Sequence, residues 1–185
     1  MSRTGLLLMD LQNAIVSRYA NDPAFIARLQ QVTEAARKAA MPVIYVVVRF
    51  RPHYPEVSAR NKSFSALKDS GFSMEEGNEA AEIHNAFPPQ PSDIIVTKRR
   101  VGAFSGSDLD IVLRSQDIHH IIWTGIATSG VVLSTLRAAA DLDYPITVLS
   151  DCCYDKDPEV HRVLMEKVFP MQAEVLTAEQ WLSRF

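Results

Sequence analysis

Apolar, β-branched runs alternate with helical patterns along this chain. Runs rich in Val, Ile and Leu are followed by segments in which apolar residues recur every three or four positions. This alternation is typical of a parallel β-sheet that is covered by helices on both faces. We predict six strands, near residues 4–9, 43–48, 93–96, 120–124, 146–149 and 173–176.

Two Asp-Pro pairs mark expected helix starts, because an aspartate caps a helix and a proline fits its first position. Asp22-Pro23 precedes one apolar stripe and Asp157-Pro158 precedes another. The segment Thr-Ala-Glu-Gln, which starts at residue 177, has the form of a capping box. Further helices are expected near residues 107–110 and over residues 129–142.

The pattern loosens between Arg49 and Phe87. This segment contains turn formers and the aromatic residues Tyr54, Phe64 and Phe72, which we expect to be exposed. A connection of this length in a compact domain is usually functional or poorly ordered. Two interpretations stay open: a lid over a ligand pocket, or part of a subunit interface.

Length and composition narrow the classes of function. The chain has 185 residues, and we expect residues 1–185 to form one domain. Its net charge is −3, no basic block stands out and Arg99-Arg100 is only a doublet, which argues against nucleic-acid binding. No apolar run is long enough for a bilayer span or a secretory signal, so no membrane partner is expected. The adjacent Cys152 and Cys153 form a poor disulfide pair, which favours a reducing, cytoplasmic setting.

Three motifs carry a resemblance to a known family. They are Leu-Met-Asp10-Leu-Gln-Asn, Thr-Lys98-Arg-Arg with the following Ala-Phe, and Thr-Gly-Ile-Ala-Thr128-Ser-Gly-Val131-Val-Leu-Ser-Thr. Together they resemble the isochorismatase-like (cysteine hydrolase) superfamily, over about Gly5 to Leu176. The resemblance implies a three-layer α/β/α sandwich with a six-stranded parallel sheet in the order 3-2-1-4-5-6.

The resemblance also implies a site. The family places an Asp, a Lys and a Cys in one pocket, and these positions correspond to Asp10, Lys98 and Val131 here. Valine cannot attack a carbonyl, so the nucleophile of the family is absent. Expected substrate-binding residues are Gln12, Arg99, Phe104, Thr128, Ser129 and Gly130.

The loop before the third helix is expected to keep an oxyanion site, formed by the backbone N–H groups of Gly130 and Val131. The resemblance further predicts a cis peptide bond between these two residues. The hydroxyls of Ser129 and Ser134 are close by, but no histidine base is near them in sequence. Gln12 has a second interpretation, in which it holds the loop that carries Asp10.

Two functions follow. The first is a hydrolase that acts on a small, carboxylate-bearing metabolite without a cysteine, with Asp10 as general acid and base. Isochorismatases hydrolyse a vinyl ether, and protonation of that ether requires a carboxyl group whose pKa is raised by burial. A neighbouring Lys98 would lower the same pKa.

The second function is an inactive relative that binds a small molecule or serves as an assembly subunit. No cofactor is expected, and no metal, because His53 lacks the Asp-x-His pattern of the metal-binding branch. His161 is expected at an exposed or interface position of a helix. The resemblance predicts a homodimer or homotetramer.

Overall fold

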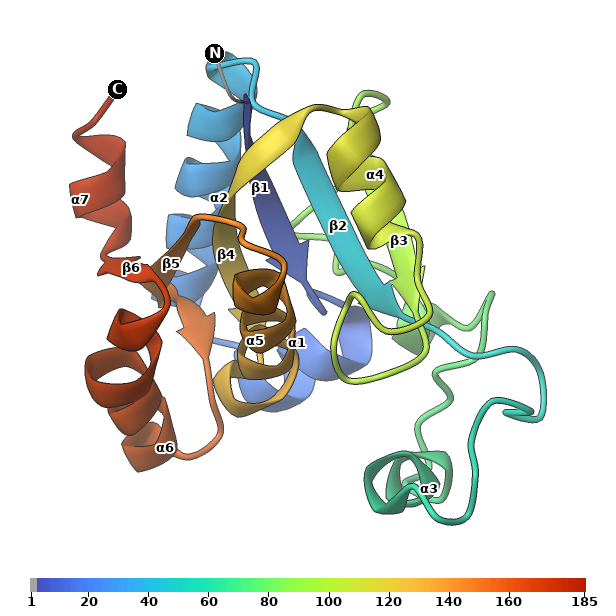
Figure 1. The fold of residues 1–185 in the computed structure, drawn as a ribbon. Coiled ribbons are helices and arrows are strands. Elements are labelled where there is room, and N and C mark those ends of the chain that lie inside the picture. Colours follow the sequence, from blue (N-terminus) through green and yellow to red (C-terminus); the bar gives the residue numbers. More distant parts are fainter. Residues whose placement is uncertain (1–2) are drawn as a thin grey trace.

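Six parallel strands form one sheet at the centre of the molecule (Figure 1). The computed structural model describes residues 3–185. The strands are β1 (Arg3–Met9), β2 (Val43–Val48), β3 (Ile94–Lys98), β4 (Ile118–Ile126), β5 (Ile146–Tyr154) and β6 (Glu174–Leu176). Their order is β3-β2-β1-β4-β5-β6 with parallel pairing throughout, which confirms the predicted topology.

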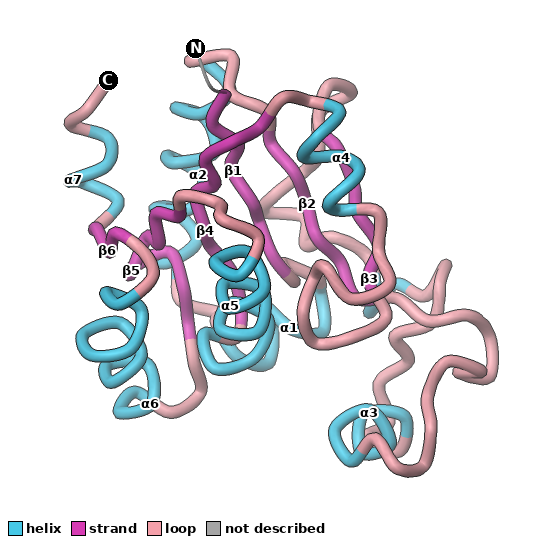
Figure 2. Tube along the Cα trace, in the orientation of Figure 1, coloured by secondary structure: helices cyan, strands magenta, loops and turns pink. Residues whose placement is uncertain are grey.

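Helices cover both faces of the sheet, and Figure 2 shows them around the central strands. One face carries α1 (Asn13–Tyr19), α2 (Pro23–Lys38) and α7 (Ala178–Leu182), and the other carries α4 (Leu109–Ser115), α5 (Leu133–Asp141) and η3 (Leu164–Val168), which continues α6 (Pro158–Val163). Successive residues of a strand point to opposite faces. Leu7 and Met9 of β1 accordingly join the α4/α5 core, whereas Leu6 and Leu8 join the α2/α7 core.

The predicted helix starts are confirmed. Asp22 accepts a hydrogen bond from the Ala24 N–H, and Asp157 caps α6 in the same way. Thr177 forms the expected capping box. The helix predicted over residues 129–142 is divided into a short turn, η2 (Thr128–Val132), and α5, because the backbone at Gly130 is not helical (φ −97°, ψ −106°).

Strand β5 is longer than predicted. It continues through Ser150 and Asp151 to Tyr154, so Cys152 and Cys153 lie inside the strand and not after it. The prediction ended the strand before Ser150 and Asp151 because these residues are polar. At this point the pairing with β4 shifts register, from Trp123 opposite Val148 to Gly125 opposite Cys153.

The Arg49–Phe87 segment contains α3 (Lys62–Lys68) and has a small core of its own. In Figure 1 it extends from the carboxyl end of β2, away from the sheet. Tyr54 and Phe64 are each only 8% exposed, so their predicted exposure was wrong. Both rings pack against Phe50, at centroid distances of 5.2 Å, whereas Phe72 is 44% exposed as expected. The expected dimer or tetramer stays a prediction, now with less apolar surface to support it.

Within residues 3–185, no helix combines the length and the apolar character that a bilayer span requires.

Candidate active site

Asp10 lies at the carboxyl end of β1, where the chain turns out of the sheet. Its backbone has a positive φ of 58°. This left-handed conformation is uncommon for a residue with a side chain, and aspartate is among those that adopt it most readily. The Asp10 N–H still donates to the Val46 carbonyl (2.8 Å), so the residue belongs to the end of the β-ladder. Its carboxyl group is thereby fixed at the edge where ligands bind in open α/β sheets.

Lys98 ends β3 and forms an ion pair with Asp10. The Lys98 Nζ lies 3.0 Å from Asp10 Oδ2, and the two side chains are 2% and 8% exposed. Lys98 also donates to the Arg100 carbonyl (3.2 Å). The other carboxylate oxygen, Asp10 Oδ1, is buried and has no hydrogen-bond partner among the described residues. The structure therefore brings together the Asp and the Lys that the motifs indicated, and leaves one acceptor of the pair unused.

Burial raises the pKa of the Asp10 carboxyl above its ordinary value. The positive charge and the hydrogen bond of Lys98 lower this pKa, but they offset only part of the desolvation. Of the two opposing effects on the Asp10 pKa that the sequence indicated, burial outweighs Lys98. A carboxyl group that keeps its proton at higher pH is suited to general acid catalysis.

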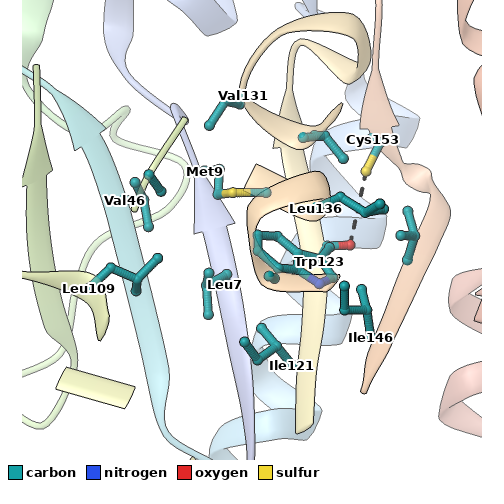
Figure 3. Packing of buried hydrophobic residues seen from close by; sticks show 14 of the residues in the cluster. Leu7, Met9, Val46, Leu109, Ile121, Trp123, Val131, Leu136, Ile146 and Cys153 are labelled. Carbon is teal, nitrogen blue, oxygen red and sulfur yellow. Dashed lines mark hydrogen bonds between the residues drawn. The ribbon is translucent and has the colours of Figure 1, made fainter. Parts of the chain in front are cut away.

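Val131 follows β4 and packs into the core. It is 2% exposed and belongs to the same cluster as Met9, Trp123 and Leu136; Figure 3 shows it beside the end of β1. Gly125 allows the end of β4 to approach β1. Its φ is +140°, and a Cβ there would lie 2.4 Å from the Met9 carbonyl oxygen. Only glycine lets the end of β4 come so close to the end of β1.

The predicted oxyanion site is not present in the expected form. The Gly130 N–H already donates to the Ala127 carbonyl (3.0 Å), and the Val132 N–H shares that acceptor (3.3 Å). The prediction for Gly130 was therefore wrong, because the η2 turn uses its N–H internally. The cis peptide bond was also misplaced: it joins Ile126 and Ala127, and the bond between Gly130 and Val131 is trans.

Gln12 is completely buried and bonded to the backbone. Its Oε1 accepts from the Val48 N–H (2.8 Å), and its Nε2 donates to the Val48 carbonyl (2.9 Å) and the Ala81 carbonyl (2.6 Å). These contacts use the whole amide. They fit a residue that holds the loop after Asp10 to β2, and not the predicted substrate-binding residue.

Arg99 is occupied by carboxylates of the Arg49–Phe87 segment. Its Nε donates to Glu56 Oε1 (2.9 Å), and its Nη2 bonds Glu76. The substrate role predicted for Arg99 conflicts with this double pairing, since both acids neutralise its charge. The ring of Phe104 is also in contact with another side chain, and its substrate role stays a prediction. Its ring stacks on Tyr144, which precedes β5 at the amino edge of the sheet, at a centroid distance of 6.2 Å.

Thr128 and Ser129 are held by residues that the sequence did not indicate. Thr128 is fully buried, and its Oγ1 lies 2.8 Å from His161 Nδ1. The Ser129 N–H donates to Asp155 Oδ2 (2.7 Å). The fully exposed position predicted for His161 was therefore wrong, because its half-buried ring turns inward to the η2 turn, and the interface position stays a prediction. No local pattern could have shown this, since Thr128 and His161 are 33 residues apart.

Ligand cavities usually measure about 300–1,000 Å³, and one of ≈ 340 Å³ is lined by Glu56, Arg99, Arg100, Ser105 and Gly106. It adjoins the Asp10–Lys98 pair through the Arg100 carbonyl that Lys98 bonds. A larger cavity of ≈ 770 Å³ lies between α1 and the chain around Phe72 and Glu79. Neither Asp10 nor Lys98 lines either cavity, but the smaller one is joined to the pair through Arg100, so the greater volume of the other does not make it the reaction site. Within residues 3–185, no three His, Cys, Asp or Glu side chains are grouped to bind a metal.

The two cysteines are poor nucleophiles. Cys152 and Cys153 are both buried, and burial raises the pKa of each thiol. We expect iodoacetamide to leave both unmodified in the folded protein and to alkylate both in denaturant, because the thiolate is the reactive form. Intact-mass spectrometry measures this. Rapid alkylation of the folded protein with loss of activity would make one of them a relocated nucleophile.

Comparison with known proteins shows the family of this chain. Residues 4–180 match the family model described as the isochorismatase domain. The chain is 34% identical to the ureidoacrylate amidohydrolase RutB of Stutzerimonas stutzeri, over 85% of this chain and 72% of that protein. It is 33% identical to the RutB of Pseudomonas syringae pv. syringae, over 84% of this chain and 72% of the relative.

Solved structures share the fold. An isochorismatase family protein from Burkholderia thailandensis superposes with a TM-score of 0.81 at 30% identity, covering 97% of this chain and 94% of that one. A cysteine hydrolase from Pseudomonas syringae pv. phaseolicola has a TM-score of 0.89 at 23% identity, covering 98% and 92%. The chain belongs to the isochorismatase family of hydrolases.

Proposed function

We propose that this hydrolase acts on a small, carboxylate-bearing metabolite without a cysteine, and that Asp10 is its general acid and base. The observation that carries the proposal is the buried Asp10–Lys98 pair, with a raised Asp10 pKa and an unpartnered Oδ1. A cysteine mechanism is closed to this site because Val131 occupies the nucleophile position. An acid mechanism needs only the groups that the site retains.

For an enol ether, the reaction balances with Asp10 alone. The protonated carboxyl transfers its proton to the terminal carbon of the double bond, which leaves an oxocarbenium ion. Water adds to the cationic carbon and returns one proton to the Asp10 carboxylate. The resulting hemiketal separates into a ketone and an alcohol. Lys98 stabilises the carboxylate that exists between the two proton transfers, through the 3.0 Å ion pair.

Arg100 is the group we assign to the substrate carboxylate. Arg99 is neutralised by Glu56 and Glu76, whereas Arg100 makes no ion pair within the described part of the chain and lines the cavity next to Lys98. A guanidinium binds a carboxylate through two parallel hydrogen bonds. The substrate named in the relatives, ureidoacrylate, is itself a small carboxylate, which supports this class of substrate.

Arg100→Gln is expected to raise KM about tenfold for a carboxylate substrate and to leave kcat within about threefold, because a charge-assisted hydrogen bond is lost in both the bound and the transition state. Steady-state kinetics measure the two constants. Arg60→Gln is the matched control, since Arg60 is also exposed and lies away from the cavity. A neutral amide analogue should show no difference between the variants. An unchanged KM for Arg100→Gln would remove Arg100 from the substrate site.

The second function, a binding or assembly subunit without turnover, is favoured by one observation. Val131 is packed in the core and Asp10 Oδ1 is closed to solvent. A substrate therefore reaches the Asp10 carboxyl only when the groups that bury it move. A turnover screen decides between the functions. We expect hydrolysis of a carboxylate-bearing member of a set that contains isochorismate, ureidoacrylate, nicotinamide and simple amides. Binding without turnover across such a set would favour the subunit.

A further inference from the structure

The η2 turn is held by two contacts that the proposed reaction does not use. The first is the bond between the buried Thr128 Oγ1 and His161 Nδ1, at 2.8 Å. Thr128 begins η2, and His161 comes from α6, which packs beside this turn. The Thr128 side chain makes no other hydrogen bond within residues 3–185, so His161 is the group that satisfies its buried hydroxyl.

The second contact holds the backbone of the same turn. Asp155, which follows β5, is buried, and its Oδ2 accepts from the Ser129 N–H (2.7 Å). Its Oδ1 accepts from the Asp157 N–H (3.2 Å), at the cap of α6. One carboxylate thus links η2 to the start of the helix that carries His161. Side chain and backbone of η2 are therefore fixed by adjoining groups from one neighbouring segment.

We propose that His161 is a positioning residue that, with Asp155, holds the η2 turn in place when its imidazole is neutral and releases it when the imidazole is protonated. The turn carries Val131, which belongs to the same core cluster as Met9, the residue before Asp10. The inference concerns the order of this turn, and so it stands apart from the reaction proposed for Asp10.

The effect of protonation follows from the fact that His161 Nδ1 is the only acceptor for the Thr128 hydroxyl among the described residues. In the Nε2–H tautomer, Nδ1 accepts the proton of the Thr128 hydroxyl. An imidazolium has N–H groups only and can do no more than donate to Thr128 Oγ1, so the proton of the buried hydroxyl loses its acceptor. The imidazolium also attracts the Asp155 carboxylate, which then competes with the Ser129 N–H for that oxygen. Protonation therefore weakens both contacts of the turn.

The direction of the pH effect follows from the environment of His161. Burial lowers the His161 pKa below its ordinary value, and the charge of Asp155 offsets part of that decrease. The other charged groups nearby are Asp157, Glu159 and Arg162 of α6 and Glu166 of the next turn, and Arg162 pairs with both glutamates. The η2 turn has no titratable side chain. Because the folded pKa is lowered, the hold on η2 is present at neutral pH and is lost as pH falls through that pKa.

Hydrogen exchange of the amides of residues 127–133 tests the proposal without any substrate. After correction for intrinsic exchange, we expect these amides in the wild type to exchange about tenfold faster at about pH 5 than at about pH 7.5, the effect of losing a hydrogen bond. His161→Leu should exchange fast at both pH values. His161→Gln should exchange slowly at both, since its carbonyl accepts from Thr128 and does not titrate.

His120→Gln is the matched control. His120 is also partly buried with a lowered pKa, and it bonds Thr147 Oγ1 (2.9 Å) near the amino end of β4. This variant should keep the wild-type pH dependence in η2. A pH-independent wild-type rate overturns the proposal, and so does a pH-dependent His161→Gln. Identical exchange in the Gln and Leu variants would show that His161 only fills space.

Discussion

Asp10→Asn should lower kcat by about 10²- to 10⁴-fold, the usual worth of general acid catalysis. The amide has the shape of the carboxyl group and its oxygen still accepts from Lys98, but it has no acidic proton to transfer. The change should therefore appear in kcat on the substrate found in the turnover screen, while circular dichroism shows the fold intact. Wild-type turnover in this variant would make Asp10 structural and the acid mechanism wrong.

Val131→Cys is the companion variant for the same mechanism. Cysteine is smaller than valine and fits the position, but a thiol there is surrounded by Met9, Trp123 and Leu136. Apolar surroundings raise a thiol pKa, and the Gly130 N–H is already bonded. We expect native turnover within about threefold of the wild type, because general acid chemistry uses no thiolate. A large increase would mean that this site works by nucleophilic attack.

The strand bounds could be predicted from the sequence where every residue of the strand is buried. Strand β2 was predicted with its exact bounds because all six of its residues, Val43–Val48, are buried and apolar. Strand β5 was cut short because Ser150 and Asp151 interrupt the apolar run. Both polar side chains have hydrogen-bond partners further along the chain. Ser150 donates to the Leu176 carbonyl of β6, and Asp151 accepts from the Ala178 N–H of α7. Contacts of this kind have no local signal.

In the candidate site, too, local motifs were predictable and long-range contacts were not. Asp10 follows β1 and Lys98 ends β3, the two strands on either side of β2, so a motif at each strand end was enough to place them at the same edge of the sheet. The roles of Arg99 and Thr128 depend on side chains that approach from far along the chain. Glu56 lies 43 residues from Arg99, and His161 lies 33 residues from Thr128. A sequence shows which groups carry charge, but the partner that neutralises or holds each group is set by tertiary packing.

Gly125 connects the fold to the changed chemistry. Its positive φ and its approach to the Met9 carbonyl place η2 against β1 whether residue 131 is a thiol or an isopropyl group. The geometry of the site is thus independent of the nucleophile. What the valine alters is the polarity of the core at the end of β1, where it lies in one cluster with Met9. Lower polarity favours the protonated carboxyl, which is the form that acid catalysis needs.

Lys98→Met is expected to give the largest loss of stability, and the loss should depend on pH. Removing one partner of a buried ion pair typically costs about 3–5 kcal/mol in the free energy of unfolding. Here the Asp10 carboxyl can escape part of that cost by keeping its proton, because its folded-state pKa is already raised by burial. Without Lys98, which lowers that pKa, it should rise further. The alkaline limb of the kcat profile should therefore move to higher pH, as the acid form of Asp10 persists longer.

The sign of the stability change follows from linkage. A carboxyl whose folded-state pKa exceeds its unfolded value of 3.8 binds its proton more tightly when folded. Its contribution is therefore present below the unfolded pKa and is lost as pH rises through the folded one. Urea unfolding should show Lys98→Met close to the wild type at about pH 4 and much weaker at about pH 8. Lys38→Met, which removes an exposed partner of Glu34, should change little at either pH. An equal loss at both pH values would mean that Asp10 stays ionised without Lys98, and the raised pKa on which its acid role depends would be refuted.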